Sequence, residues 1–354
     1  MVRWKNEVSY LSPVPLSWGR RGLNKLSDAG SLTGIQAPTN LRNLDVKPYA
    51  LGAVVTNKQA TPPIENVDDL DLGVDAKWGI TQSLVADLTF HTDFAQVEDD
   101  EGQVNLTRFS VLFPEKRDFF LEGQDVFSFG GMGGMFGGGG GGGFGPQAIQ
   151  GGGGGGGGNN VTPILFFSRR IGLQNNTVVP IDGGARLIGR GGGYQIGALH
   201  MHTARSDAAA AEPTNFSVLR INRDILQRSR VGMIATRRGP SLASASENYA
   251  YGADAQLNLR TELQIEGSWS ATRSSDGPSA DGRSEQSYRG RFNWNADKTG
   301  LQVDHLFVGE GFNPEVGFLR RSAFRRTYGQ ARYSPRPSSW RGVRKVYYEA
   351  SLDY

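Results

Sequence analysis

The chain contains no cysteine in its 354 residues, so no disulfide framework can hold it together. That absence fits a cytoplasmic protein, and it fits equally well an envelope protein built without disulfides. The sequence also lacks any run of about 18 apolar residues, which excludes a transmembrane helix. No apolar signal-peptide core follows Met1, so for an exported protein we expect the natural start to lie upstream.

Charge of one sign is scarce as well. The chain has 38 basic and 35 acidic residues, a formal net charge of +3, which indicates no nucleic-acid partner. Hydrophobic residues make up 38%, fewer than the core of a soluble domain of this length normally requires. Walker motifs, nucleophile elbows and zinc-type Cys/His spacings are absent, so we predict no cofactor.

What the sequence does contain is alternation. In residues 262–272, Leu263, Ile265, Trp269 and Ala271 fall on one face of an extended strand, and polar side chains fall on the other. The same two-faced pattern predicts thirteen strands: about 48–57, 72–79, 83–92, 183–190, 194–203, 215–223, 229–237, 249–259, 262–272, 287–295, 299–308, 326–333 and 345–354.

The apolar face must meet either lipid or a protein core. The predicted strands have about the length that a tilted barrel strand needs to cross a bilayer. Their polar faces carry true charges, as a watery lumen permits, and Trp78, Tyr249, Trp294 and Tyr354 lie toward strand ends, where interfacial girdles form. These features favour lipid, and the alternative is a soluble all-β protein with one solvated face.

The gaps between strands alternate in length, as in outer-membrane barrels, which have short periplasmic turns and longer outer loops. This rhythm predicts a periplasmic N-terminus in the bacterial outer membrane. An odd number of strands departs from the even number of single-chain bacterial barrels, so either one strand is misassigned or the barrel is incomplete, and we favour the second. The short gaps are 79–82, 191–193, 224–228, 260–261 and 296–298, and the long ones are 58–71, 93–182, 204–214, 238–248, 273–286 and 309–325.

The gap at residues 93–182 is too long for a hairpin loop. Its first part mixes aromatic and charged residues, which predicts a folded, plug-like segment that packs into or over the barrel mouth. The Gly-rich tracts 137–143 and 151–158 that follow lack the Lys-Ser/Thr of a phosphate loop. They are typical of a flexible linker or an exposed loop.

Four blocks carry a family resemblance: DFAQVEDDEGQVNLTRFSVLFPEKRDFFLEGQDVF from residue 93, PILFFSRRIGL from 163, VPIDGGARLIG from 179 and FNPEVGFLRR from 312. With them, residues 45–354 resemble the bacterial outer-membrane β-barrel family called domain of unknown function 5916. The resemblance implies a carbohydrate-binding module of the family-9 type before the barrel. Residues 1–45 are then a remnant of that module and its linker, and 46–354 form the barrel domain, with members commonly longer at the C-terminus.

Candidate catalytic residues are carboxylates of the insertion, because a glycosidase needs two carboxyl groups on either side of the scissile bond. In the alternative, these carboxylates pair with neighbouring cations and tie the insertion to charges such as Arg169 and Arg170. The candidates are Glu115, Asp118 and Glu122.

Two further patterns suggest binding. Aromatic rings can stack on sugars, and the insertion offers such rings beside two cations; packing against the barrel wall is their alternative use. The acidic run 98–101 could bind calcium through its oxygen ligands, although a solvated acidic turn is the simpler interpretation of that run. His200 and His202 place two imidazoles on one face of a strand, which suits a transition metal. The binding candidates are Phe109, Phe113, Lys116, Arg117, Phe119 and Phe120, and the metal candidates are Glu98, Asp99, Asp100, Glu101, His200 and His202.

Together these observations predict an all-β protein, an antiparallel outer-membrane β-barrel with a long inserted segment, in contact with membrane lipid. We expect it to bind or pass glycans or small solutes without catalysis. Two alternatives stay open: an envelope glycoside hydrolase that uses carboxylates of the insertion, and a soluble β-sandwich adhesin.

Overall fold

A computed structural model describes residues 2–3, 7–8, 34, 43–57, 64–91, 115–130, 162–174, 177–226, 228–242, 245–260, 262–275, 284–337 and 343–354. The chain divides into two compact units. The described residues of the first unit, Met1–Leu41 with Gly134–Asn159, form the small hairpin β1(Val2–Arg3) and β2(Glu7–Val8). The second unit, Arg42–Gly133 with Asn160–Tyr354, contains the main sheet. No helix among these residues is long and apolar enough to cross a membrane.

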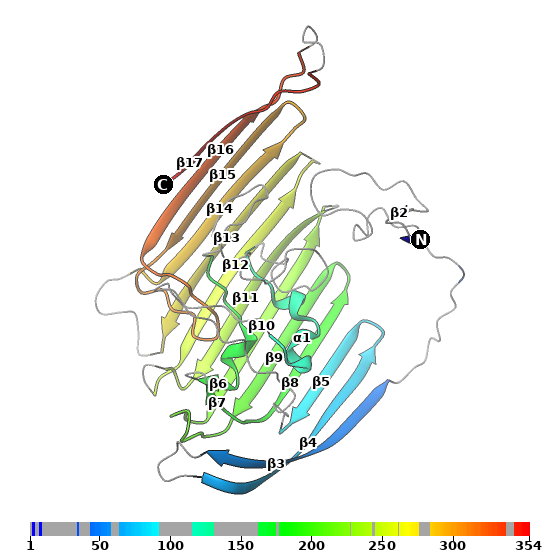
Figure 1. Cartoon of the computed structure of the whole chain (residues 1–354), viewed down its shortest axis with the longest axis vertical. Helices are drawn as coiled ribbons and strands as arrows, with labels where there is room; N and C mark the ends of the chain where they lie inside the picture. The colour runs from blue at the N-terminus through cyan, green and yellow to red at the C-terminus, as the bar shows by residue number, and fades with distance from the viewer. Residues whose placement is uncertain are drawn as a thin grey trace. The chain divides into compact units, whose positions relative to one another are not determined.

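The main sheet is antiparallel throughout, and its thirteen strands follow one another in chain order (Figure 1). This confirms the all-β prediction and every predicted strand. The architecture differs from a β-sandwich, because these strands form one sheet rather than two packed sheets. The strands are β3(Leu44–Asn57), β4(Ile64–Thr81), β5(Leu84–Phe90), β8(Ile181–Gly191), β9(Tyr194–Thr203), β10(Thr214–Ile225), β11(Ser229–Gly239), β12(Asn248–Asn258), β13(Leu263–Ser274), β14(Gln286–Asn295), β15(Thr299–Val308), β16(Phe324–Tyr333) and β17(Tyr348–Asp353).

Two connections differ from the predicted rhythm. The predicted loop 58–71 is largely strand, because β4 already begins at Ile64 and pairs with the end of β3. The predicted strands already leave residues 334–344 between the last two strands, where the alternation has a short gap, and in the structure the connection from β16 to β17 spans residues 334–347. The predicted short gaps lie at one end of the sheet, which we call the turn end; the opposite end is the loop end.

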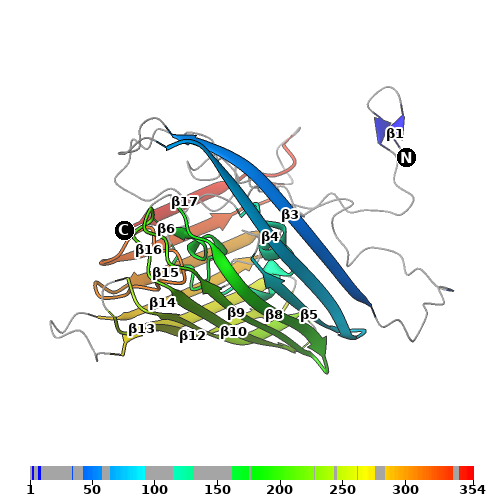
Figure 2. The same cartoon turned by 90° about the horizontal axis from the view of Figure 1, so that it is seen from below.

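Within this unit the sheet is strongly curved, and the folded parts of the insertion lie on its concave face, called the inner face below (Figure 2). These parts include α1(Asp118–Leu121), η3(Gln124–Phe127), η4(Ser168–Arg170) and the short pair β6(Leu173–Gln174) and β7(Thr177–Val178). Among the described residues the sheet is open, since β3 pairs only with β4 and β17 only with β16.

The apolar core lies between the insertion and the inner face. Phe120, Phe127 and Phe166 of the insertion pack with side chains of the strands and of the loop between β15 and β16. Strand residues with the alternate parity point the other way and are exposed. The predicted packing of the insertion against the sheet is therefore confirmed for its described parts. Strand residues of this core are Ile181, Leu199, Met201, Phe216, Val218, Ile234, Ala250, Leu306 and Val308.

Candidate functional site

A buried ion pair joins the two described parts of the insertion. The Glu115 carboxylate accepts hydrogen bonds from Arg117 Nε (2.7 Å) and Nη2 (2.7 Å), and from the hydroxyl of Ser168 (2.5 Å). Arg117 also donates to the carbonyls of Ile171 (2.6 Å) and Ser168 (2.8 Å). We call Glu115, Arg117 and Ser168 the insertion clamp. It ties residues 115–130 to residues 162–174.

The clamp keeps its carboxylate ionised. Burial opposes ionisation of Glu115, which is only 7% exposed, but the hydrogen bonds and charge of Arg117 and the Ser168 hydroxyl outweigh that effect. The pKa of Glu115 is therefore held below its usual range. An ionised carboxylate that accepts hydrogen bonds from five donors is suited to holding a structure, since it has no proton to give.

Charged residues of the sheet strands hold the insertion against the inner face. Arg186 of β8 forms an ion pair with Asp87 of β5 (2.7 Å) and donates to the backbone carbonyls of Phe119 and Glu122. Arg220 of β10 forms a two-pronged pair with Asp254 of β12, at 2.6 and 3.0 Å. Both pairs bond to the insertion, because Arg186 donates to its backbone carbonyls and Asp254 accepts a hydrogen bond from the Gly130 N–H (3.2 Å).

The segment Phe312–Phe318, between β15 and β16, closes over the insertion. The backbones of Ile164 and Phe318 exchange two hydrogen bonds (2.9 and 2.8 Å), and Arg170 donates to the Gly317 carbonyl (3.0 Å). Glu315 is buried and accepts from the Ser241 hydroxyl (2.9 Å). Blocks that are far apart in the sequence, from residues 115, 163 and 312, thus meet on one face.

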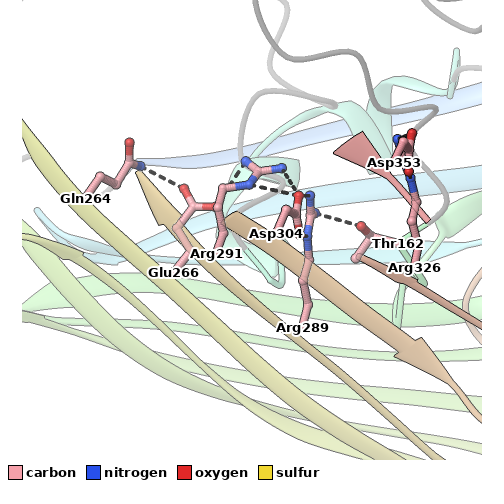
Figure 3. A network of polar contacts seen from close by, with 8 residues as sticks. All are labelled: Thr162, Gln264, Glu266, Arg289, Arg291, Asp304, Arg326 and Asp353. Carbon is pink, nitrogen blue, oxygen red and sulfur yellow. Dashed lines mark hydrogen bonds and ion pairs between the residues drawn. The ribbon is translucent and has the colours of Figure 1, made fainter. Parts of the chain in front are cut away.

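Farther along the inner face, toward β17, charges of neighbouring strands pair across the sheet (Figure 3). Asp304 of β15 accepts from Arg289 of β14 (2.9 and 2.5 Å) and from Arg291 (3.2 and 3.1 Å). Arg291 also reaches Glu266 of β13 at 3.3 Å. Arg326 of β16 pairs with Asp353 of β17. We call these six residues the inner charge ladder.

The ladder is a polar surface rather than a catalytic pair. Its cations and anions balance one another, and most of its side chains are partly exposed. Arg289 also donates to the Thr162 hydroxyl (2.7 Å), so the ladder touches the edge of the insertion. Such a surface offers both hydrogen-bond donors and acceptors to a polar ligand.

The other predicted carboxylates have separate environments. Asp118 is exposed at the start of α1. Glu122 is exposed too, and it forms ion pairs with Lys77 of β4 and, at 3.5 Å, with Arg186. The expected pairing within the insertion therefore occurs between Glu115 and Arg117. The insertion is tied to the sheet through Lys77 and Arg186, and Arg170 donates to a backbone carbonyl. The catalytic hypothesis for these carboxylates stays a prediction.

The described aromatic candidates are used in packing. Phe120 is buried with Arg117 over its ring at 4.2 Å, and the half-buried Phe119 stacks under Arg186 at 4.8 Å. The two rings meet edge to face. Lys116 is half-buried, and its backbone N–H donates to Glu115 (3.0 Å). Their proposed role in ligand binding stays a prediction.

The metal candidates receive no third ligand in the described part of the chain, where no group of three or more His, Asp or Glu side chains could hold an ion. His200 and His202 lie on the outer face of β9, bonded to Ser217 (2.9 Å) and Asn215 (3.0 Å). The remaining site candidates and both Gly-rich tracts lie outside the described residues: Phe109, Phe113, Glu98, Asp99, Asp100, Glu101, 137–143 and 151–158.

Several residues of the site were not predicted as such. The alternation places Arg289 and Arg291 on the polar face, but it does not reveal that Asp304 joins them. For Arg186 and Arg220 the sequence shows only that they fall on the polar face of a predicted strand, and a charge at such a position is the feature that could have identified them.

Comparison with known proteins agrees with the resemblance described above over the first part of the chain. The model of the family described as Domain of unknown function (DUF5916) matches residues 39–135. The match spans β3, β4 and β5 and includes Glu115 and Arg117 of the insertion clamp. It supports the DUF5916 family for this sequence. No curated protein matches the chain significantly.

Proposed function

We propose that this chain, whose residues 39–135 match the DUF5916 family, forms the wall of a bacterial outer-membrane β-barrel. In this proposal the insertion is a plug on the inner face, and the inner charge ladder lines the space beside it. The protein binds or passes small polar solutes or glycans and performs no catalysis.

The observation that carries the proposal is the inverted polarity of the sheet. On the outer face, Met233 is 60% exposed and Trp269 is 41% exposed, although both are apolar. On the inner face, Arg220 is only 2% exposed. A sheet surrounded by water has its apolar side chains covered and its charges exposed. If lipid surrounds the outer face, the exposed apolar side chains contact hydrocarbon and the charges of the inner face stay away from it.

Aromatic residues support a membrane boundary at the turn end. Five exposed rings lie near tight turns or at the ends of strands that face them, as an interfacial girdle requires, while others such as Tyr249 and Tyr288 lie nearer the loop end. Because barrels of this kind have short periplasmic turns, this end is proposed to face the periplasm. The rings are Trp78, Tyr194, Trp294, Tyr333 and Tyr348.

A membrane also imposes a condition on the sheet edges. Unpaired backbone N–H and C=O groups cost several kcal/mol each in hydrocarbon, so both β3 and β17 need partners there. Thirteen antiparallel strands leave β3 and β17 running in the same direction. Direct closure between them would be a parallel pair, and an antiparallel closure requires an odd number of additional strands.

The absence of native cysteine allows a direct test of the lipid-facing side. Gln302 and Val303 are adjacent in β15 and point to the inner and outer face, respectively. We would place a single cysteine at each position, attach a spin label and reconstitute the protein in liposomes. The label at 303 should collide mainly with oxygen, and the label at 302 mainly with a water-soluble nickel complex. Equal nickel accessibility at both positions would disprove the proposal.

Passage of solutes is tested separately, in planar bilayers. Replacing residues 93–176 by a short Gly-Ser linker should increase the conductance of the inserted protein, because the insertion covers the inner face. The wild-type protein at the same concentration is the control. Unchanged conductance in a variant that inserts normally would rule out the insertion as the element that limits passage.

A further inference from the structure

A small cavity lies on the inner face at the loop end, where the segment from η4 to β6 meets β9, β10 and β11. Its volume is about 10 Å³, which is room for roughly one water-sized group. The cavity belongs to neither the insertion clamp nor the inner charge ladder. Its polar lining comprises Arg170, Gln174, Thr203, Thr214 and Arg238, and Phe216 forms part of its apolar side.

The lining has two guanidinium groups and no carboxylate. Arg238 is only 6% exposed and lies over the ring of Phe216 at 5.1 Å, while Arg170 stands at the exposed rim. The carboxylate of Glu315 lies 3.7 Å from Arg238 but outside the lining. A single negative charge therefore faces two positive ones.

That carboxylate is already engaged by other donors. It accepts from the Ser241 hydroxyl (2.9 Å) and from the backbone N–H of Leu242 (2.9 Å). Buried charges normally occur in compensated pairs, because an uncompensated charge in a protein interior is costly. Buried Arg238 shares Glu315 with Arg170 at the rim, so the two cations around the cavity outnumber the nearby carboxylate, and an anion would balance the second positive charge.

Hydrogen-bond donors remain for such an anion. Arg170 uses Nε for the Gly317 carbonyl (3.0 Å), and within the described part of the chain its terminal nitrogens have no acceptor. Arg238 uses Nε for the Pro240 carbonyl (3.3 Å) and Nη2 for Gln174, at a long 3.4 Å. Guanidinium groups bind carboxylates and other small anions through charge-assisted hydrogen bonds.

We propose that this cavity is an anion-binding site, in which Arg170 and Arg238 hold a chloride ion or a single carboxylate group. The size of the cavity excludes a sugar ring or a nucleotide, but it admits one halide ion or one oxygen of a carboxylate whose remaining atoms lie outside, toward the loop end. The proposal does not depend on membrane insertion, since the site lies entirely within one described unit of the chain.

The test uses the full chain folded in detergent, with chloride as the probe. Bound chloride broadens the ³⁵Cl NMR line, so the wild type should show excess broadening that saturates with chloride concentration. Arg170→Gln should weaken chloride binding by about tenfold or more, as expected for the loss of one charge-assisted hydrogen bond. Arg169→Gln is the matched control, because it removes the same charge one residue away, outside the lining.

Acetate distinguishes the two sources of the anion. If acetate displaces half of the bound chloride at a concentration below the chloride concentration that half-saturates the site, the site prefers a carboxylate. If a higher acetate concentration is needed, the site prefers a free halide.

Equal ³⁵Cl line broadening in wild type and Arg170→Gln would refute the site. An equal loss of broadening in Arg169→Gln and Arg170→Gln would refute it as well. Arg238→Gln is a weaker test because it leaves Glu315 buried without a cation. Chloride binding in detergent and oxygen access in liposomes fail independently, so this inference and the proposed function are judged separately.

Discussion

At the residue scale, the decisive feature is that the buried charges Glu115 and Arg117, in the described part of the insertion, are partners of each other. Glu115 and Arg117 are separated by a single residue, yet together they reach Ser168 and Ile171, about fifty residues later in the chain. A buried pair is costly to form, but it is far more costly to break, because the remaining charge stays in the interior without compensation. The insertion clamp should therefore be sensitive to the loss of either charge.

The substitution Glu115→Gln should destabilise the folded chain by about 3–5 kcal/mol, because it leaves Arg117 buried and uncompensated. Urea titration, followed by the gel mobility of the folded form, measures the change. Asp118→Asn is the matched control, since this exposed carboxylate lies three residues away and should change stability by less than about 0.5 kcal/mol. Equal effects of the two substitutions would contradict the role of the clamp.

The clamp also predicts a pH dependence. The pKa of Glu115 is lower in the folded chain than its ordinary value of 4.5, so ionisation of this group favours folding. Its contribution should be fully present above pH 4.5 and should decline as the pH falls toward the folded-state pKa. The stability difference between wild type and Glu115→Gln should be constant near neutrality and should shrink below pH 4.5. If the stability difference grew on acidification instead, the pKa of Glu115 would not be lowered by folding.

At the element scale, the loop between β15 and β16 connects the far strands to the insertion. Its segment Phe312–Phe318 contains side chains that are nearly inaccessible, and its backbone pairs with Ile164. At Gly317 the backbones come so close that a side-chain methyl group would overlap the carbonyl oxygen of Ile164. Glycine is required here by contact between segments rather than by an unusual backbone angle.

Gly317→Ala should therefore cost about 1–3 kcal/mol, the usual range for a group forced into a closely packed site. Gly329→Ala in β16 is the matched control, since no atom lies within 4 Å of the added methyl group. That substitution should be neutral or slightly stabilising, because alanine restricts the unfolded chain. Differential scanning calorimetry of both variants would decide, and a similar melting temperature would count against the proposed contact.

At the scale of the whole molecule, the two faces of one sheet carry different side chains. The outer face is apolar over most strands, whereas the inner face holds the core of the insertion and the inner charge ladder. In water, an exposed apolar side chain can be exchanged for a charged one at almost no cost. In lipid, the same exchange is expensive, so one substitution distinguishes the two media.

Met233→Arg, in the middle of β11 on the outer face, should destabilise the protein in a bilayer by about 2–4 kcal/mol. Leu226→Arg introduces the same residue in the turn between β10 and β11 and should cost about 0–1 kcal/mol, because this position lies outside the hydrocarbon. Reversible unfolding from liposomes provides the measurement. A cost below 0.5 kcal/mol for Met233→Arg would place the outer face in water.

The sequence alone determined the strands and the parity of their side chains. Alternation has a period of two and is a local property, so it is visible in Leu263, Ile265 and Trp269 without knowledge of any partner. Loop lengths were less predictable, because pairing with β3 extends β4 back to Ile64. The folded character of residues 115–130 was also visible, since aromatic and charged residues mix there.

Only the tertiary structure decided which charged side chains pair and which of them bond to the insertion. The bonds from Arg289 to Thr162 and from Arg170 to Gly317 join residues more than a hundred positions apart. They depend on the curvature of the sheet and on the register of its strands, which no local pattern encodes. For the same reason, the cavity between Arg170 and Arg238 exists only in the folded chain, where the insertion meets the inner face.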